Sequence, residues 1–166
     1  MHRALLTLIL ACLPLACDDP EPEPFLGDDE FVRDPALDIE LASARGDDRS
    51  HADGDNCMRC HQENGPGPGR FSAAGTVYDA SGAPAPDGLV ELRSAPDGMG
   101  DLVLALEVDA RGNFYSTEPL PFPDTALFPT VYSDDGARKN HMPFPTRSGA
   151  CNVCHAGGFG VRLPEG

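Results

Sequence analysis

Five residues in a fixed order occur twice in this chain, and both copies could carry redox chemistry. Cys57–His61 has the sequence C-M-R-C-H, and Cys151–His155 has the sequence C-N-V-C-H. Two thiols three residues apart can form thioether bonds to the vinyl groups of one haem, and C-x-x-C-H is the attachment signature of c-type haem. The histidine after the second cysteine can supply one axial bond to the iron. We therefore expect two covalently attached c-type haems. The expected attachment residues are Cys57, Cys60, Cys151 and Cys154, and the expected proximal iron ligands are His61 and His155.

Two other chemistries could use the same cysteines. A zinc ribbon also takes two C-x-x-C pairs, but ribbons keep the pairs close together, whereas these are separated by the stretch from Cys60 to Cys151. A pair of redox dithiols would be expected with a thioredoxin-like βαβ pattern, which is not visible here. The two remaining cysteines, Cys12 and Cys17, lie in or end an N-terminal apolar run. No cysteine pair is then left over for a structural disulfide, and the histidine in both copies favours haem.

The second axial ligand of each iron must come from outside the two motifs. If His2 is removed with a signal peptide, four histidines remain, of which two are the proximal ligands. His51 and His141 are then the candidate distal ligands, because each lies within ten residues of a motif. Met142 competes with His141, and methionine in place of histidine would raise the reduction potential of that haem.

The N-terminal region has the pattern of an export signal followed by a spacer. Residues 1–16 contain a short apolar run that is too short to span a bilayer, which needs about 20 residues. The end of this run at Cys17 resembles the lipobox of bacterial lipoproteins, which implies cleavage before Cys17 and its lipidation. An alternative lipobox ends at Cys12, and an ordinary cleaved signal peptide is the other alternative.

Charge divides the chain into a strongly acidic segment and a more balanced body. The chain of 166 residues has a formal net charge of −15 and a pI near 4.4, which argues against nucleic acid as a partner. Residues 18–55 contain 14 Asp and Glu against three Arg, so they carry −11 of that charge. A Pro-Glu alternation at 20–24 favours an extended spacer. We expect residues 17–50 to form a lipidated acidic tether, with some apolar side chains that could dock on the body.

Between the two motifs the hydrophobic period becomes two, which predicts β-strands separated by Gly, Pro and Asp turns. Strands are expected at 75–78, 89–93, 102–109, 114–116 and 128–133. In the second of these, Val90 and Leu92 should face one side and Glu91 and Arg93 the other; in the third, Leu102 should share a face with Leu104. The expected fold is mainly β with little helix: a small antiparallel sandwich flanked by the two motifs.

A family resemblance supports this fold. The residues that carry it are Gly75–Tyr78, Ser81–Pro84, Val90–Leu92 and Asp109–Phe114. Their order resembles the carboxypeptidase-regulatory, transthyretin-like β-sandwich module over about residues 71–134. The whole arrangement is similar to bacterial dihaem c-type cytochrome lipoproteins that carry such a module between two C-x-x-C-H motifs. The resemblance implies a dihaem cytochrome domain at 51–166 with the sandwich as an insert.

The sequence leaves three functions open. The first is a membrane-tethered dihaem electron carrier of the cell envelope, either periplasmic or surface-exposed, with the outer membrane favoured over the inner. Its partners would be the membrane, other redox proteins or cytochromes, and a second copy of itself. The second is a dihaem redox enzyme of peroxidase type, which needs an open iron site and acid/base residues. The third is a haem-based sensor. Because the sequence shows no catalytic constellation beyond the haem ligands, we favour the carrier.

Overall fold

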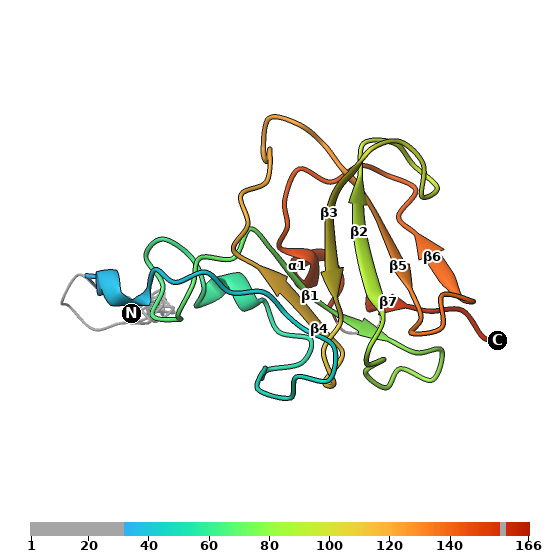
Figure 1. The fold of residues 1–166 in the computed structure, drawn as a ribbon, viewed down its shortest axis with the longest axis horizontal. Coiled ribbons are helices and arrows are strands. Elements are labelled where there is room, and N and C mark those ends of the chain that lie inside the picture. Colours follow the sequence, from blue (N-terminus) through green and yellow to red (C-terminus); the bar gives the residue numbers. More distant parts are fainter. Residues whose placement is uncertain (1–31, 157–158) are drawn as a thin grey trace, which may run out of the picture. The chain divides into compact units, whose positions relative to one another are not determined.

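The computed structural model describes residues 32–156 and 159–166, and they form a mainly β fold (Figure 1). The described strands are β1 Ala73–Tyr78, β2 Leu89–Arg93, β3 Leu102–Glu107, β4 Asn113–Ser116, β5 Phe128–Tyr132, β6 Lys139–His141 and β7 Val161–Arg162. The described helices are short: the 3-10 helices η1 Pro35–Leu37 and η2 Cys57–Arg59, and the α-helix α1 Cys151–Cys154. The prediction of a small β-sandwich with little helix is confirmed.

The strands form a four-stranded sheet and a three-stranded sheet. The larger sheet has the order β3-β2-β5-β6, and every pair in it is antiparallel. The smaller sheet has the order β4-β1-β7, in which β1 and β4 are antiparallel but β1 and β7 are parallel. The five strands predicted from the sequence are all present, whereas β6 and β7 were not predicted.

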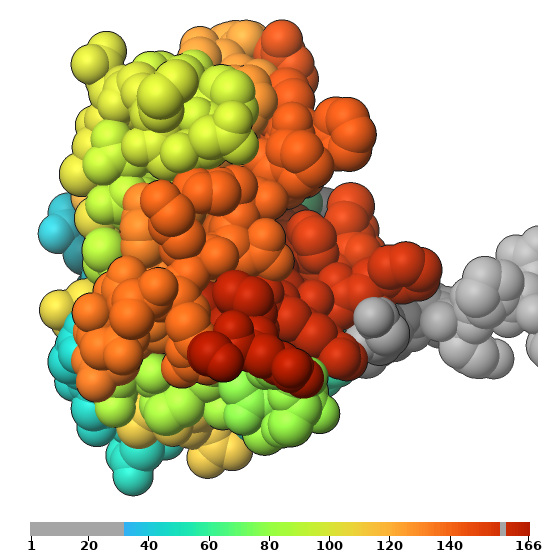
Figure 2. Space-filling view, turned by 90° about the vertical axis from the view of Figure 1, so that its right-hand side faces the viewer, coloured from blue at the N-terminus to red at the C-terminus, as the bar shows by residue number. Residues whose placement is uncertain are grey.

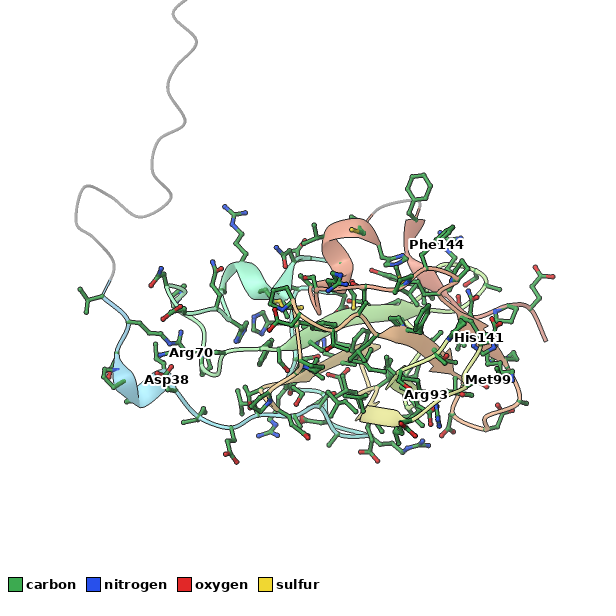
Figure 3. The ribbon with its side chains drawn as sticks, turned by 90° about the horizontal axis from the view of Figure 1, so that it is seen from above. Asp38, Arg70, Arg93, Met99, His141 and Phe144 are labelled. Atoms are coloured by element: carbon green, nitrogen blue, oxygen red, sulfur yellow. The ribbon has the colours of Figure 1, made fainter. Side chains whose placement is uncertain are left out.

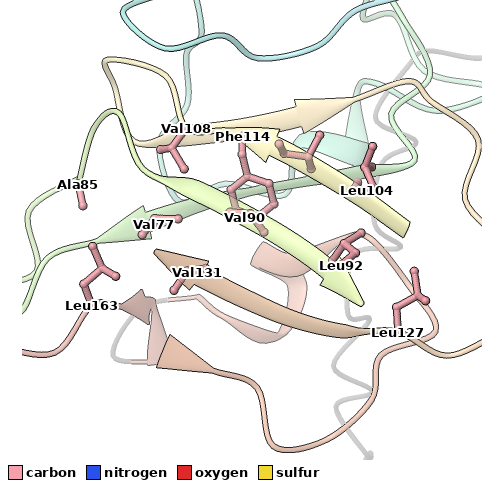
Figure 4. Close-up of a cluster of buried hydrophobic side chains, with 12 residues drawn as sticks. Val77, Ala85, Val90, Leu92, Leu104, Val108, Phe114, Leu127, Val131 and Leu163 are labelled. Atoms are coloured by element: carbon pink, nitrogen blue, oxygen red, sulfur yellow. The ribbon is translucent and has the colours of Figure 1, made fainter. Parts of the chain in front are cut away.

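The hydrophobic core lies between the two sheets (Figure 4). Val90 and Leu92 of β2 are buried, and the intervening residues are only partly buried, so the predicted alternation is confirmed. The small sheet contributes Val77 and Phe114 to the same cluster. Burial of these apolar side chains from both sheets is the main force that holds the sandwich together.

One predicted side chain lies on the other face of its strand. Leu102 is 49% exposed, although Leu104 and Leu106 of the same strand are buried. The pairing between β2 and β3 shifts at this point, because Leu92 pairs with Leu104 but Arg93 pairs with Leu102. Val103 is the extra, unpaired residue on β3, and this β-bulge places Leu102 on the same face of the sheet as Arg93.

Part of the segment expected as a tether belongs to the sandwich. Ala42 forms an antiparallel bridge with Ser116 of β4. On either side of it, Ser43 N donates to Tyr115 O at 2.9 Å and Thr117 N donates to Leu41 O at 2.9 Å. Residues 41–43 therefore extend the edge of the small sheet, and the compact unit begins well before residue 50.

The N-terminal predictions concern residues that are not described. The signal peptide at 1–16, the lipidated Cys17 and the Pro-Glu spacer all lie outside the described residues. Among the residues that are described, no helix has the length and apolar character needed to cross a membrane.

Candidate haem sites

Strand β1 contacts both C-x-x-C-H motifs. The second motif lies between two contacts with one edge of this strand: Ala74 N donates to Gly149 O at 2.9 Å before the motif, and Leu163 N donates to Tyr78 O at 2.8 Å after it. Between these contacts the chain leaves the sheet to form α1, which contains Cys151 and Cys154. The second motif is thus held at the edge of β1 from both sides.

The side chain of Asn152 joins the two motifs. Its Oδ1 accepts a hydrogen bond from Thr76 N of β1 at 3.0 Å. Its Nδ2 donates to Asp55 O at 2.8 Å, and Asp55 lies two residues before Cys57. The same Nδ2 lies 3.1 Å from Thr76 Oγ1, which also accepts from Gly54 N. The structure therefore brings together two motifs that lie more than ninety residues apart in the sequence. Sequence reasoning treated Asn152 as a variable position of the motif and missed this role.

His61, the proximal histidine of the first motif, is held on one side by a backbone carbonyl and on another by an aromatic ring. Its Nδ1 lies 2.7 Å from Pro68 O, and its ring stacks on Phe71 with centroids 4.1 Å apart. Gly67 lies against the same ring, since a Cβ there would be 2.8 Å from His61 Nδ1. Burial lowers the pKa of His61, which favours the neutral imidazole.

A residue of the expected tether supports this loop. The guanidinium of Arg33 donates to Gly67 O at 2.8 Å and to Gly65 O, and it forms an ion pair with Asp38 at 2.7 Å. Its side chain is only 6% exposed. An arginine in an acidic segment offers no sequence signal for this position.

His155, the proximal histidine of the second motif, makes the equivalent contact. Its Nδ1 lies 3.0 Å from Phe159 O. A carbonyl oxygen can only accept, so the proton of the neutral ring must be on Nδ1 in both His155 and His61. The other ring nitrogen, Nε2, then carries a free lone pair in each motif, which is the arrangement of a metal-ligating histidine.

The thiols of Cys57 and Cys151 are protonated at neutral pH. Burial raises the pKa of Cys57. Burial also raises the pKa of Cys151 to about 12, and the neighbouring Cys57 acts in the same direction. Cysteines that act as redox nucleophiles have lowered pKa values, so these two thiols differ from those of a redox dithiol.

An apolar pocket of about 480 Å³ lies beside the second motif. Cys151, Cys154 and His155 line part of it, and residues of β2, β4, β5, β6 and β7 and of the segment between β6 and α1 line most of the rest. Figure 2 shows the orange segment that contains β5 and β6 next to the red segment that contains α1 and β7. The volume falls within the range of about 300–1,000 Å³ that is usual for cofactor and ligand sites. Arg162 is the one Lys, Arg, Asp or Glu among the described lining residues.

The two distal candidates near this pocket, His141 and Met142, differ in direction. His141 Nδ1 lies 3.0 Å from Thr130 Oγ1, and its ring approaches Gly98. Figure 3 shows His141 near Met99, the residue that follows Gly98 in the sequence. Thr130 pairs with Glu91 on the outer face of the sheet, so the ring of His141 lies on that face. His141 and Met142 both contribute atoms to the pocket wall. Because Met142 follows His141 directly, alternation places its side chain on the inner face of the sheet.

At the first motif, the distal candidate His51 lies close to His61. Their ring centroids are 6.1 Å apart and their planes are tilted by 41°. Two imidazoles on opposite sides of one iron would have centroids about 6 Å apart, because each metal–nitrogen bond is about 2 Å and each centroid lies about 1 Å behind its nitrogen. The separation of the rings is thus compatible with one iron between them.

A zinc site would need a different arrangement of ligands. No group of three or more His, Cys, Asp or Glu side chains that could hold a metal ion is found among the described residues. Haem iron takes at most two protein ligands, so the haem prediction does not depend on such a group. Comparison of the chain with protein-family models, with curated proteins and with solved structures finds no match.

Proposed function

We propose that this protein is a membrane-tethered dihaem c-type cytochrome that carries electrons in the cell envelope. The observation that carries the proposal is the repeated contact of the motif histidines: in both His61 and His155, Nδ1 is bonded to a backbone carbonyl and Nε2 is left for iron. One such contact has many explanations, but the same contact in both C-x-x-C-H motifs is what two haem sites require. Covalently held haem would supply a one-electron iron couple at each site.

The surroundings of the second motif support the proposal. The porphyrin is a large apolar group with two carboxylates, and the pocket beside Cys151 and Cys154 is largely apolar. Arg162 at its rim supplies a positive charge for a propionate. Either Met142 or His141 would complete the iron coordination, and Met142 has the more suitable direction.

The first site would be held by Cys57, Cys60 and His61, with His51 as the distal ligand. The hydrogen bond to Pro68 and the stacking on Phe71 fix the orientation of the His61 ring. A buried neutral imidazole with a fixed tautomer binds iron without a prior change in protonation.

The carrier is favoured over a peroxidase-type enzyme by the side chains of the pocket. Acid/base catalysis needs a titratable group within hydrogen-bond reach of the reacting atom. The described lining residues include no carboxylate, and the two lining histidines are the proximal His155 and the outward-bonded His141.

Cys17 would anchor the protein, preferably in the outer membrane. The partners of the protein would be other redox proteins, including a second copy of the chain.

The test is expression of the full chain in a host with cytochrome c maturation, followed by intact-mass measurement and a pyridine haemochrome spectrum. The expected mass gain is two haems that survive acid-acetone extraction. Replacing Cys57 and Cys60 by Ala should remove one haem, and replacing Cys151 and Cys154 should remove the other. The matched control is Asn64→Ala, at an exposed residue outside both motifs and outside the pocket, which should retain both.

Two results would overturn the proposal. A mature protein with no covalent haem, or with zinc in its place, would refute the cytochrome assignment. A protein that contains both haems but reacts rapidly with peroxide, or binds carbon monoxide at both irons, would refute the carrier in favour of the enzyme or the sensor.

A further inference from the structure

We infer that the two haem sites form one interacting pair, and that Asn152 is the positioning residue that holds their attachment segments together. This inference rests on the proposed function, because it concerns the distance between the two sites. It goes further, since two C-x-x-C-H motifs could equally lie at opposite ends of a sandwich and act independently.

The first argument is the burial and bonding of Asn152. Its side chain is 3% exposed and makes three hydrogen bonds, whereas the adjacent Val153 is 58% exposed. A buried amide is costly unless its donors and acceptor are all satisfied. Two of its three partners are on Thr76 and the third is the carbonyl of Asp55, so the amide joins α1 to β1 and to the segment before Cys57.

The second argument is the convergence of both segments on one strand. Gly54 before the first motif donates to Thr76, and Ala150 before the second motif forms a bridge with Ala74. Residues 74 and 76 are two positions apart on the same strand. From the Asn152–Asp55 bond and the length of an extended chain, the Cα atoms of Cys57 and Cys151 lie less than about 20 Å apart.

This proximity has an electrostatic consequence for two haems attached at these motifs. The pocket beside the second motif is largely apolar. Charges in a water-poor environment interact more strongly than charges in solvent. An electron gained at one site would therefore reduce the tendency of the neighbouring site to accept another.

The experiment compares the wild-type protein, Asn152→Ala and Asn152→Asp with the control Asn64→Ala, which removes an exposed asparagine side chain. Single-haem variants that lack one cysteine pair give the properties of each site alone. The readouts are the midpoint potentials of both haems and the circular dichroism of the Soret band, where two neighbouring haems give a paired positive and negative signal. Asn152→Asp keeps an acceptor for Thr76 N but loses the donor to Asp55 O and to Thr76 Oγ1, so it removes the hydrogen bond that links Asn152 to the segment before Cys57.

We expect the wild type and Asn64→Ala to show a paired Soret signal that is absent from both single-haem variants. We also expect the potential of each haem to depend on the presence of the other. Both effects should weaken in Asn152→Asp and Asn152→Ala, with the haem content unchanged. Asn152→Asp supplies the answer if Asn152→Ala does not fold.

A readout without haem tests the link directly. In the haem-free chain, the side-chain amide protons of Asn152 should show nuclear Overhauser contacts to residues 55 and 56. A wild-type protein without haem would refute both the proposed function and the interaction between the two haem sites. The amide contacts would then still show whether Asn152 joins the two motif segments. A protein with two haems whose spectra are the sum of the single-haem variants, or with coupling unchanged in Asn152→Asp, overturns the inference alone.

Discussion

The close approach of α1 to β1 makes a strong prediction for Gly75→Ala. A Cβ at this position would lie 2.6 Å from Phe114 Cζ and 2.9 Å from the Cβ of Cys151. Carbon atoms in good contact are about 3.5–4.0 Å apart, so these neighbours would have to move by about 1 Å. Phe114 is only 2% exposed and belongs to the core, and the Cβ of Cys151 moves only with its backbone.

The expected magnitude follows from two opposing effects. Overpacking of a core usually costs about 1–3 kcal/mol. Replacing glycine by alanine also removes conformational entropy from the unfolded chain, which contributes about 0.4–1 kcal/mol in the stabilising direction. We therefore expect Gly75→Ala to lower the free energy of unfolding by about 1–2 kcal/mol, measured by urea denaturation of the purified protein.

A second substitution distinguishes the steric mechanism from a general loss of stability. Phe114→Leu removes the ring atoms that the new methyl group meets, so the double variant should be more stable than the sum of the two single changes predicts. With the proposed haems in place, the spectrum of the one at Cys151 should change more in Gly75→Ala than that of the one at Cys57. Strict additivity in the cycle, or equal stability of wild type and Gly75→Ala, would refute the reasoning.

Three further predictions concern other parts of the molecule. Gly67→Ala should displace the ring of His61 and weaken its Nδ1 hydrogen bond. Because such a bond makes a ligating histidine more basic, a redox titration should show a higher midpoint potential for the haem proposed at Cys57 and Cys60, and an unchanged potential would contradict this. The hydrogen bond from Arg70, followed by that from Arg33, lowers the pKa of Asp38 from 3.8 to about 2. The carboxylate therefore stabilises the fold above pH 4, and the difference in unfolding free energy between wild type and Asp38→Asn should shrink as the pH falls from 4 to 2. A difference that is independent of pH would exclude the ion pairs of Asp38 as its source. Cys17→Ser should release the mature protein from the membrane fraction, and a wild-type protein that is already free of membranes would rule out the anchor.

The sequence alone determined the features that depend on local patterns. The spacing C-x-x-C-H identifies cysteines and a histidine that suit one haem wherever the chain is folded. Alternation at 89–93 predicts a strand with Val90 and Leu92 buried, because side chains on a strand point to opposite faces. Such patterns fail at Leu102, where a β-bulge in the pairing with β2 places the side chain on the opposite face of the sheet from Leu104. The local sequence contains no signal of this bulge.

Only the tertiary structure decided which strands and side chains lie together. Strand β6 is Lys139–His141, three polar residues without hydrophobic alternation, and it exists because β5 supplies its hydrogen-bond partners. The two motifs lie together for the same reason. Asn152 forms hydrogen bonds with Thr76 and Asp55, which are distant in sequence. Because an asparagine amide can bond many different partners, the sequence does not show which ones Asn152 contacts. A motif specifies the chemistry of its own residues. The distance between two motifs depends on the tertiary fold, because the fold decides which buried backbone N–H and C=O groups need hydrogen-bond partners from distant segments.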